Sequence, residues 1–588
     1  MSTGLSFSSL VQKQLEPSKV SQLPSGKNNA VGSVLNTKAD LVTFLGSPVS
    51  RMRSDIVGDS LSSKICPIQT LDGQWFILSL PEHANSDVLD TVKEKCIAAG
   101  ADKGGVKIIQ VSPYLLLSVS HRDGYDVVEV SAENDASGHF STFVDIIRYG
   151  VMNGASDVHL NVEDGEAYSQ IHFTIEGQYT APPQWRMETS RLEELLNVAW
   201  QSGSGGGAAV FSNNTEGQCR LVIRIDGQRI MCRWAALSAD RGVSVTLRLL
   251  KMDQGTERRS LESQGFLPTQ IEMFLRAQTA EGGAIVVAGV VNSGKSTALA
   301  ELISMIPRSR KILTLEDPVE YLIPGALQST VVRSLDGNDD NAFTSKLKTF
   351  KRSAGNDILL GEIRDTQTGD ALVDITGSGT NLYCTLHAKS NVQIPERLAS
   401  KAIGIPVDFL ASPGILNLLV YMALLPVLCE DCALPLSTLA ETGGMDRRGI
   451  HHEAGHWAEY IARLERLFNI DTSQLRIKSD VGCKSCQRSD LPQLNGYKGR
   501  TAVAAMLEPQ VDRGILRYIR QNDTLGLQEY CESLPKTPID HPDMTNKSLM
   551  DCAMYKAMKG QLDPRDIEQK TMSFDTFERI KLKGSVAK

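Results

Sequence analysis

The stretch that most constrains the fold of this chain is a glycine-rich turn between two apolar segments. In "AIVVAGVVNSGKST" the residues from Gly289 to Ser296 match the pattern G-x-x-x-x-G-K-S. Backbone N–H groups of such a turn, together with the N-terminus of the next helix, surround phosphate groups. The turn needs a buried strand before it and a helix after it. The pattern therefore predicts an α/β domain with a largely parallel sheet.

The same turn gives the candidate nucleotide-binding residues. Lys295 is expected to reach the β- and γ-phosphates, and Ser296 to bind Mg²⁺. The full candidate set is Gly289, Asn292, Ser293, Gly294, Lys295, Ser296 and Thr297. The bare pattern can occur by chance, but an apolar strand precedes it and "STALAELISM" has the character of a helix. Together these features favour ATP or GTP binding.

Three further apolar runs end in polar side chains. "KILTLEDPVEY" carries Glu316, Asp317 and Glu320, "DILLGEIRD" carries Glu362, and "NLYCTLHAKS" carries His387. Taken singly, each residue would be a helix cap, a solvated charge or a structural histidine. In a doubly wound sheet, however, the ligand lies at the carboxyl ends of the strands. We expect these residues around the phosphate loop, with Glu362 favoured over Glu316 as the base and the choice left open.

Composition and charge limit the class of protein. The chain of 588 residues has a formal net charge of −8, so it lacks a global basic surface and no direct nucleic-acid partner is expected. We find no apolar signal segment at the N-terminus. The most apolar run, residues 415–429, is too short to cross a bilayer as a helix. We predict a buried helix there, and a soluble, cytoplasmic protein.

Shifts in pattern along the chain predict six segments. They are a poorly ordered segment at 1–60, a small α/β domain at 61–134, an α+β domain at 135–255, an α/β nucleotide-binding domain at 256–428, a four-cysteine subdomain at 429–508 and a helical C-terminal region at 509–588.

Four of the eleven cysteines form two C-x-x-C pairs. Cys429 and Cys432 are followed, after 50 residues, by Cys483 and Cys486. In a chain without a secretion signal such pairs more often bind metal than form disulfides. Four thiolates at this spacing are typical of a structural Zn²⁺ site. The alternative is four buried thiols.

A second metal-binding pattern lies between these pairs. His452-Glu453-Ala454-Gly455-His456 matches H-E-x-x-H, the zinc-protease motif. That site needs both histidines on one helix face and a third ligand, and no third ligand stands out. We therefore place proteolysis second, as an ATP-dependent zinc protease, and leave open whether either histidine contacts the zinc.

Taken in order, these segments resemble a known family of motors. "GVVNSGKST", "TLEDPVEY", "LLGEIRD" and "CTLHAKS" are similar to the Walker A, Asp box, Walker B and His box of the secretion and pilus-assembly ATPases, and "NGASDVHL" to the entry of their second N-terminal domain. The resemblance runs from about residue 138 to 510. It implies a RecA-like P-loop motor domain preceded by a PAS-like domain, a homo-hexameric ring, and ATP with Mg²⁺ bound between the two domains.

The resemblance also implies roles for two arginines. In the family, arginines on two strands of the preceding domain reach the phosphates, and Arg233 and Arg248 have the matching spacing of fifteen residues. Their charge would match that of the γ-phosphate in the transition state. One departure stands out: Val290-Val291-Asn292 replaces the usual Pro-Thr-Gly. Asn tolerates left-handed backbone better than most residues, so the loop is expected to survive with altered turnover.

The function implied by the resemblance is ATP hydrolysis that powers assembly of a type IV pilus or a related type II secretion or conjugative filament. The implied partners are an inner-membrane platform protein, an accessory inner-membrane assembly protein and, indirectly, pilin or pseudopilin. The implied location is cytoplasmic, peripheral to the inner membrane. The cysteine insertion favours assembly over retraction. A retraction motor, a DNA-uptake or conjugation motor, and a non-hydrolysing nucleotide-gated scaffold remain alternatives.

Overall fold

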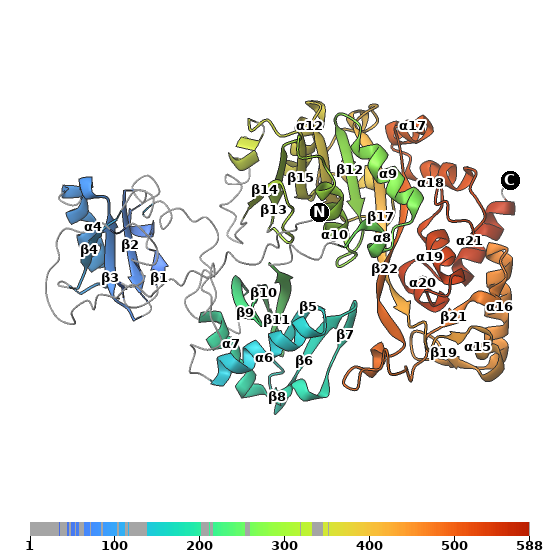
Figure 1. The fold of residues 1–588 in the computed structure, drawn as a ribbon, viewed down its shortest axis with the longest axis horizontal. Coiled ribbons are helices and arrows are strands. Elements are labelled where there is room, and N and C mark those ends of the chain that lie inside the picture. The colour runs from blue at the N-terminus through green and yellow to red at the C-terminus, as the bar shows by residue number, and fades with distance from the viewer. Residues whose placement is uncertain are drawn as a thin grey trace, which may run out of the picture. The chain divides into compact units, whose positions relative to one another are not determined.

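The computed structural model describes most of residues 64–111 and 138–586, together with residues 49–52 and 54–57, a few single residues before them and Leu116. The gaps inside these ranges are 71, 84–85, 103–104, 202–210, 212–215, 253–258, 318, 332–344, 348 and 351. The chain divides into two compact units, residues 1–126 and 127–588 (Figure 1). The predicted N-terminal segment 1–60 lies mostly outside the described residues, as does the predicted boundary at 134.

The first unit is a small α/β structure. Its sheet has the order β1-β2-β3-β4, with β1 at Val49–Met52, β2 at Ile65–Thr70, β3 at Trp75–Ser79 and β4 at Lys107–Gln110. The helical elements are α2 (Ser54–Val57), η1 (Pro81–His83) and α4 (Asp87–Ala98). Every residue of β3 is buried, since Ile77 packs with Leu89 of α4 and Phe76 packs on the opposite face.

The second unit begins with an α+β domain. Its sheet has the order β7-β6-β5-β11-β10-β9, and β8 pairs with β6. The strands are β5 (Ala155–Asn161), β6 (Tyr168–Ile175), β7 (Gln178–Thr180), β8 (Arg186–Glu188), β9 (Gly217–Ile225), β10 (Gln228–Ala239) and β11 (Gly242–Lys251), with η2 at Pro183–Trp185. Helices α6 (Gly138–Met152) and α7 (Thr189–Gln201) cover one face of the sheet (Figure 1). Buried and partly exposed residues alternate along β6, as expected for a sheet with one covered face.

The α/β domain that follows contains the glycine-rich turn. Its sheet has the order β14-β13-β15-β16-β12-β17-β22, parallel throughout except for the last pair. The strands are β12 (Gly283–Ala288), β13 (Ile312–Glu316), β14 (Ala326–Thr330), β15 (Asp357–Glu362), β16 (Asn381–Leu386), β17 (Leu416–Leu428) and β22 (Tyr497–Leu507).

Helices pack on both faces of this sheet. They are α8 (Leu261–Gln264), α9 (Pro268–Gln278), α10 (Lys295–Ser304), α12 (Thr366–Gly377), α13 (Ile394–Ala399) and α14 (Val407–Leu410). On β12, Ile285 and Val287 face the core formed with α9 and α10, while Val286 faces the core formed with α12. A strand covered on both sides must be apolar at every position, and all six residues of β12 are buried.

The prediction of a buried helix at residues 415–429 is wrong. The segment forms the long strand β17, which pairs in parallel with β12 and antiparallel with β22. In a run that is apolar at almost every position, the spacing of apolar residues indicates neither a helix nor a strand. The prediction therefore depended on the length of the run, which favoured a helix. Pro426 is tolerated because the pairing with β22 becomes irregular between Pro426 and Leu428.

The cysteine region lies between β17 and β22. It contains β18 (Leu434–Pro435), α15 (Ser437–Thr442), β19 (Gly444–Met445), β20 (His451–His452), α16 (Ala454–Phe468), η3 (Thr472–Gln474), β21 (Arg476–Ile477) and η4 (Pro492–Leu494). The chain ends in α17 (Arg513–Gln521), α18 (Thr524–Ser533), α19 (Leu549–Met558), α20 (Pro564–Lys570) and α21 (Phe574–Val586). Helices α20 and α21 pack beside α16 (Figure 1), and buried Asp563 of this region pairs with Arg447 at 2.8 Å.

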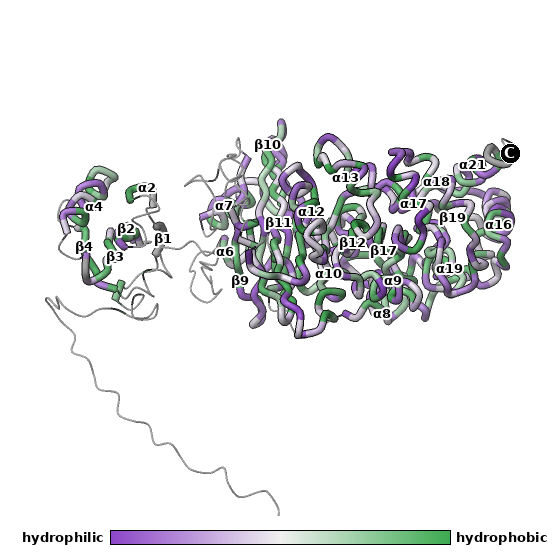
Figure 2. Tube along the Cα trace, turned by 90° about the horizontal axis from the view of Figure 1, so that it is seen from above, coloured by the Kyte–Doolittle hydropathy of each residue, from purple (hydrophilic) through white to green (hydrophobic). Residues whose placement is uncertain are grey.

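In the trace coloured by hydropathy, hydrophilic and hydrophobic stretches are interspersed along the described chain (Figure 2). None of the helices in the described part of the chain is both long and apolar enough to cross a membrane.

Candidate nucleotide-binding site

The glycine-rich turn joins the end of β12 to the start of α10. Asn292 and Gly294 adopt left-handed backbone, with φ of 60° and 88°. A Cβ on Gly289 would lie 2.5 Å from both the Met422 carbonyl oxygen and Ser293 Oγ, so only glycine fits there. The turn therefore closes tightly on itself, and Asn292 accepts the backbone conformation that a glycine would otherwise supply.

Lys295 lies over the mouth of this turn. Its Nζ donates to the carbonyl oxygens of Gly289 at 3.0 Å and Val290 at 2.9 Å. Burial lowers the pKa of the Lys295 ammonium to about 8, although the nearby carboxylates of Glu362 and Glu320 act in the opposite direction. A partly desolvated cation held by carbonyl oxygens is suited to an anionic ligand, because a phosphate would favour the charged form.

The carboxyl ends of β15 and β16 bring Glu362 and His387 together. His387 Nε2 lies 3.4 Å from Glu362 Oε1, and His387 Nδ1 lies 3.0 Å from the Gly289 carbonyl oxygen. Since a carbonyl oxygen only accepts, Nδ1 carries the proton in that contact, and donation to Glu362 as well requires the doubly protonated ring. The histidine thus connects the acid of one strand to the glycine-rich turn.

Glu316 has a different environment from Glu362. Its Oε1 accepts hydrogen bonds from Thr314 Oγ1 at 2.6 Å and Gln328 Nε2 at 3.1 Å, and burial raises its pKa. The Glu362 side chain retains about a third of its exposure. Nearby, Thr297 of α10 donates to the Tyr321 hydroxyl at 3.1 Å. Glu362 is therefore the more accessible of the two candidate bases, and Glu316 is already engaged by its own strand neighbours.

Both predicted arginines lie at the edge of this site. Arg233 and Arg248 are cross-strand neighbours on β10 and β11. Arg233 donates to the Asp317 carbonyl oxygen at 3.0 Å, and Arg248 Nε donates to Asp157 Oδ1 at 3.0 Å. Both arginines therefore have protein oxygen atoms as hydrogen-bond partners in this structure.

Asp157 and Arg364 are site residues that the sequence reasoning did not single out. The buried Asp157 of β5 accepts from Asn292 Nδ2 at 3.1 Å as well as from Arg248, so it connects the α+β domain to the turn. Arg364 lies two residues after Glu362 and donates to Asp317 Oδ2 at 3.4 Å. The sequence does contain a signal for Asp157, because it is an acidic residue within the predicted strand "SDVHLNV". A carboxylate in a strand is costly to bury unless it is paired with a cation or hydrogen-bond donor.

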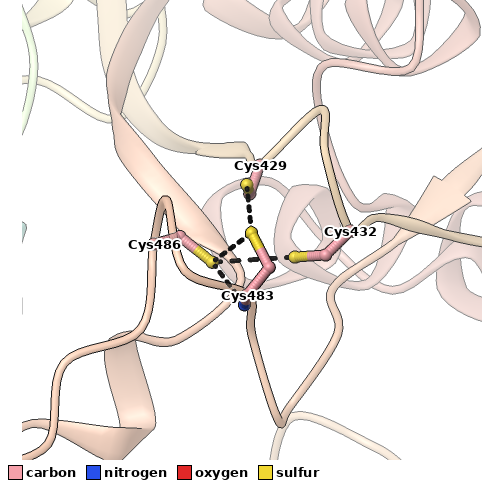
Figure 3. A group of neighbouring side chains, drawn as sticks. All are labelled: Cys429, Cys432, Cys483 and Cys486. Atoms are coloured by element: carbon pink, nitrogen blue, oxygen red, sulfur yellow. Dashed lines mark hydrogen bonds between the residues drawn. The ribbon is translucent and has the colours of Figure 1, made fainter.

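The four predicted metal ligands converge on one point (Figure 3). Their sulfur atoms all lie within 4.8 Å of one another, with separations of 3.7 Å for Cys429–Cys483, 3.6 Å for Cys432–Cys486 and 3.8 Å for Cys483–Cys486. A tetrahedral ion with Zn–S bonds of about 2.3 Å places its sulfurs about 3.8 Å apart. The backbone N–H groups of Cys483 and Gly496 also donate to Cys486 Sγ, each at 3.3 Å. The donor set and its spacing fit Zn²⁺.

The H-E-x-x-H segment does not form a protease site. His452 belongs to β20, whereas His456 lies in the first turn of α16, so the two histidines do not share a helix face. Their rings stack at 4.0 Å, and His452 Nε2 lies 3.3 Å from Asp446 Oδ2. Among the described residues, the one group of three or more candidate metal ligands is the four cysteines, which excludes both histidines.

A glycine-rich turn between a buried parallel strand and a helix, with an acid at the end of a neighbouring strand, is the arrangement of P-loop nucleotide-binding proteins. Within that class, a family model described as "Type II/IV secretion system protein" matches residues 135–537, and the chain belongs to this family. The family predicted from the sequence motifs is confirmed.

Named relatives agree with this membership. The Vibrio cholerae "Type II secretion system ATPase E" is 28% identical over 362 residues, covering 61% of this chain and 62% of the relative. The Pseudomonas aeruginosa "Type IV pilus assembly ATPase PilB" is 25% identical over 410 residues, covering 68% and 64%. The chain thus spans less than two thirds of the length of each of these relatives.

Solved structures also align over much of the chain. The Legionella pneumophila ATPase DotB covers 75% of this chain and 98% of its own, at 17% identity and a TM-score of 0.46. The pilus retraction motor PilT with bound ADP covers 74% and 98%, at 18% identity and a TM-score of 0.44.

Proposed function

We propose that this protein is an ATPase whose hydrolysis of ATP drives the assembly of a secretion or pilus filament. The observation that carries the proposal is the convergence of Lys295, Glu362 and His387 on the glycine-rich turn. Two arginines of the preceding domain lie at the same site. Membership of the Type II/IV secretion system family favours ATP as the nucleotide.

Each residue then has a distinct task in hydrolysis. Backbone N–H groups of the turn and of α10 bind the phosphates, and Lys295 exchanges its two carbonyl acceptors for phosphate oxygens. Ser296 would hold the Mg²⁺, which supplies charge neutralisation when bound. The water oxygen adds to the γ-phosphorus, the bond to the β–γ bridging oxygen breaks, and ADP leaves. Glu362 orients this water and accepts its proton, while His387 positions the Glu362 carboxylate.

The arginines would complete the site by changing partners. When nucleotide binds, Arg233 and Arg248 would leave Asp317 and Asp157 and pair with the γ-phosphate, whose negative charge must be matched in the transition state. Because both arginines belong to the α+β domain, this exchange links nucleotide state to the position of that domain. Such a link is what a motor requires.

At the level of the whole protein we propose a homo-hexamer with a RecA-like motor domain and a PAS-like domain before it. It would lie in the cytoplasm at the inner membrane, bound to a platform protein and an accessory assembly protein. Pilin or pseudopilin would be moved indirectly. The four-cysteine site and the similarity to a pilus assembly ATPase support assembly over retraction.

The test is phosphate release by purified protein carrying Lys295→Ala. Steady-state hydrolysis should fall to background with an unchanged circular dichroism spectrum, because the substitution removes the phosphate-binding ammonium and leaves the sheet intact. Lys401→Ala, at an exposed position of the same domain, is the matched control and should hydrolyse normally. Turnover retained by Lys295→Ala would overturn the proposal.

A second candidate is a nucleotide-gated scaffold that binds ATP without hydrolysing it. The observation in its favour is the loop sequence Val290-Val291-Asn292, with Asn292 bound to Asp157 across the two domains. Phosphate release distinguishes the two functions, since the scaffold predicts nucleotide binding by the wild type with no turnover.

A further inference from the structure

The segment that follows the second cysteine pair packs against the α+β domain. This docking segment, residues 488–494, contacts residues that lie 306 to 341 positions earlier in the chain. Arg488 donates to Glu176 Oε1 at 2.5 Å. Asp490 accepts hydrogen bonds from the Tyr149 hydroxyl and, at 3.1 Å, from Gln184 Nε2. These contacts join the turn after β6, helix α6 and η2 to one short stretch of the cysteine region.

Apolar side chains of the docking segment complete the core of the α+β domain. Leu491 and Leu494 have no exposed surface and belong to the same buried core as Phe143 of α6 and Phe173 of β6. Burial of two leucine side chains contributes more than these polar contacts, whose net gain is small once the loss of hydration is counted. The docking segment is therefore a principal attachment of the α+β domain to the rest of its unit.

The two ends of the docking segment are held by the cysteine cluster. Arg488 comes two residues after Cys486, and its N–H donates to the side chain of buried Asn495 at 2.7 Å. Gly496 donates its N–H to Cys486 Sγ at 3.3 Å and accepts the N–H of Cys429 at 2.8 Å. Gly496, beyond one end of the docking segment, is thus bonded to a ligand sulfur, and Arg488 at the other end is two residues from the same ligand along the chain.

Residues of β5 and β10 in the same α+β domain contribute to the nucleotide site. There Asp157 accepts from Asn292 at 3.1 Å, and Arg233 donates to the Asp317 carbonyl oxygen at 3.0 Å. These contacts are polar and their arginine is partly exposed. The domain is thus held both by a few hydrogen bonds to residues of the nucleotide site and by the buried leucines next to the cysteines.

We propose that a Zn²⁺ ion bound by Cys429, Cys432, Cys483 and Cys486 docks the α+β domain onto the motor through residues 488–494. The ion fixes the sulfur positions, the sulfurs fix the ends of the docking segment, and the segment fixes the domain that carries Asp157 and Arg233. Without an ion, four sulfurs that all lie within 4.8 Å of one another are joined only by weak sulfur–sulfur hydrogen bonds. The two leucines then leave the α+β core. This docking does not depend on whether the site hydrolyses ATP.

The first experiment is amide hydrogen exchange, followed by mass spectrometry, on the full chain with Zn²⁺, after chelation and after Zn²⁺ is restored. Peptides that contain Tyr149 and Glu176 should exchange about tenfold faster after chelation and recover with Zn²⁺, because their local opening no longer has to displace the docking segment. Peptides from β10 should stay protected, which shows that the α+β domain remains folded. Faster exchange confined to residues 429–500 would overturn the proposal.

The second experiment separates docking from metal binding. Leu491→Ala combined with Leu494→Ala should keep one Zn²⁺ per chain, yet give the same fast exchange at Tyr149 and Glu176. Leu434→Ala, an exposed leucine of the same region, is the matched control and should change neither. If the double variant loses zinc, the same two measurements are made on Arg488→Ala, which removes only the side-chain contact with Glu176. Full zinc with unchanged exchange in these variants would refute the docking role.

Discussion

Asn292 combines two functions in one side chain. Its backbone φ of 60° is one that glycine adopts freely, and its amide donates to Ser156 Oγ at 3.3 Å and Asp157 Oδ2 at 3.1 Å. Glycine at this position would give the turn its shape without a link to the α+β domain. The asparagine keeps the shape and adds the link. Asp157 then connects the turn to Arg248 through its other oxygen.

Replacement of Asp157 should strengthen nucleotide binding. In Asp157→Asn, Arg248 no longer has a carboxylate partner that a phosphate must displace, and one negative charge near the phosphates is removed. Because the Arg248 side chain of this pair is about a third exposed, the pair contributes about 1 kcal/mol, and the dissociation constant should fall about fivefold. Titration with a fluorescent ATP analogue measures it. Glu166→Gln, which alters an exposed ion pair away from the site, should leave affinity unchanged. Weaker binding by Asp157→Asn would show that the carboxylate supports the nucleotide.

Nucleotide affinity should depend on pH through Lys295. Its pKa in the free protein is about 8, and a bound phosphate favours the ammonium, so binding takes up a proton above that pH. Affinity should therefore be constant below about pH 7.5 and fall as the pH rises through 8, by up to about tenfold per unit. Titrations from about pH 6.5 to 9.5 test this. Lys295→Arg keeps its charge throughout that range, and a wild-type profile as flat as that of this variant would contradict the lowered pKa.

Among the elements, those tied to a motif could be read from the sequence and the others could not. The run before the glycine-rich turn had to be a strand, and it is β12. Residues 415–429 belong to no motif that requires a strand. The sequence of a strand buried on both faces is apolar at nearly every position, and so is that of a buried helix. Gly455 misled in another way. The H-E-x-x-H motif requires Gly455 inside a helix, but it occupies the first turn of α16, where N–H groups have no helical partner in any case.

For the candidate site too, the sequence did not predict contacts between segments that are far apart in the chain. The sequence indicated which residues follow the strands, because parallel strands end at one edge. The pairing of Arg248 with Asp157 and the burial of Leu491 depend on how one domain packs against another, which no local pattern records. The catalytic roles of Glu362, His387 and the arginines stay predictions.

Helix α19 carries a buried lysine with an unusual set of partners. Lys556 donates to the carbonyl oxygens of Gly265 at 2.5 Å and Ala502 at 2.6 Å, and to Thr501 Oγ1 at 2.8 Å. It joins the end of α8 to β22. Burial lowers the pKa of this lysine, so its folded form binds fewer protons and its contribution to stability improves as pH rises towards the lysine value of 10.5.

Lys556→Ala should destabilise the protein by about 2–4 kcal/mol, since it leaves buried acceptors without donors and opens a cavity. Thermal unfolding followed by circular dichroism measures the shift in midpoint. Lys559→Ala, one turn later and exposed, is the matched control and should change the midpoint little. Equal midpoints for the two variants would mean that the three hydrogen bonds contribute nothing net.

The cysteine unit should hold one Zn²⁺ per chain. Cys429→Ser removes one of four ligands and should reduce bound zinc by more than about tenfold, because three ligands with one weak donor no longer form a closed tetrahedral site. Elemental analysis of the purified protein measures it. Cys531→Ser, outside the cluster, should retain full zinc. A full complement of zinc in Cys429→Ser would place the metal elsewhere.

At the scale of the whole molecule, the two domains of the second unit meet at the nucleotide site. Arg233→Ala should therefore separate binding from turnover. The nucleotide dissociation constant should change by less than about threefold, while the hydrolysis rate should fall about 10²–10³-fold, since the arginine acts on charge that develops in the transition state. Parallel binding and phosphate-release assays measure both. Arg224→Ala, an exposed arginine of β9, serves as the control. Equal losses in affinity and rate would assign Arg233 to ground-state binding.

The antiparallel pairing of β17 with β22 shows where the cysteine region is inserted in the sheet. Leu428 lies directly opposite Tyr497, so residues 429–496 occupy the position of a hairpin loop. A turn of about two residues would close the same pair of strands. The sheet that bears the nucleotide site is therefore topologically complete without the zinc unit, which is an insertion at one strand end. Helices α20 and α21 pack on that insertion, so the C-terminal helices cover a surface that the uninterrupted strand pair would not present.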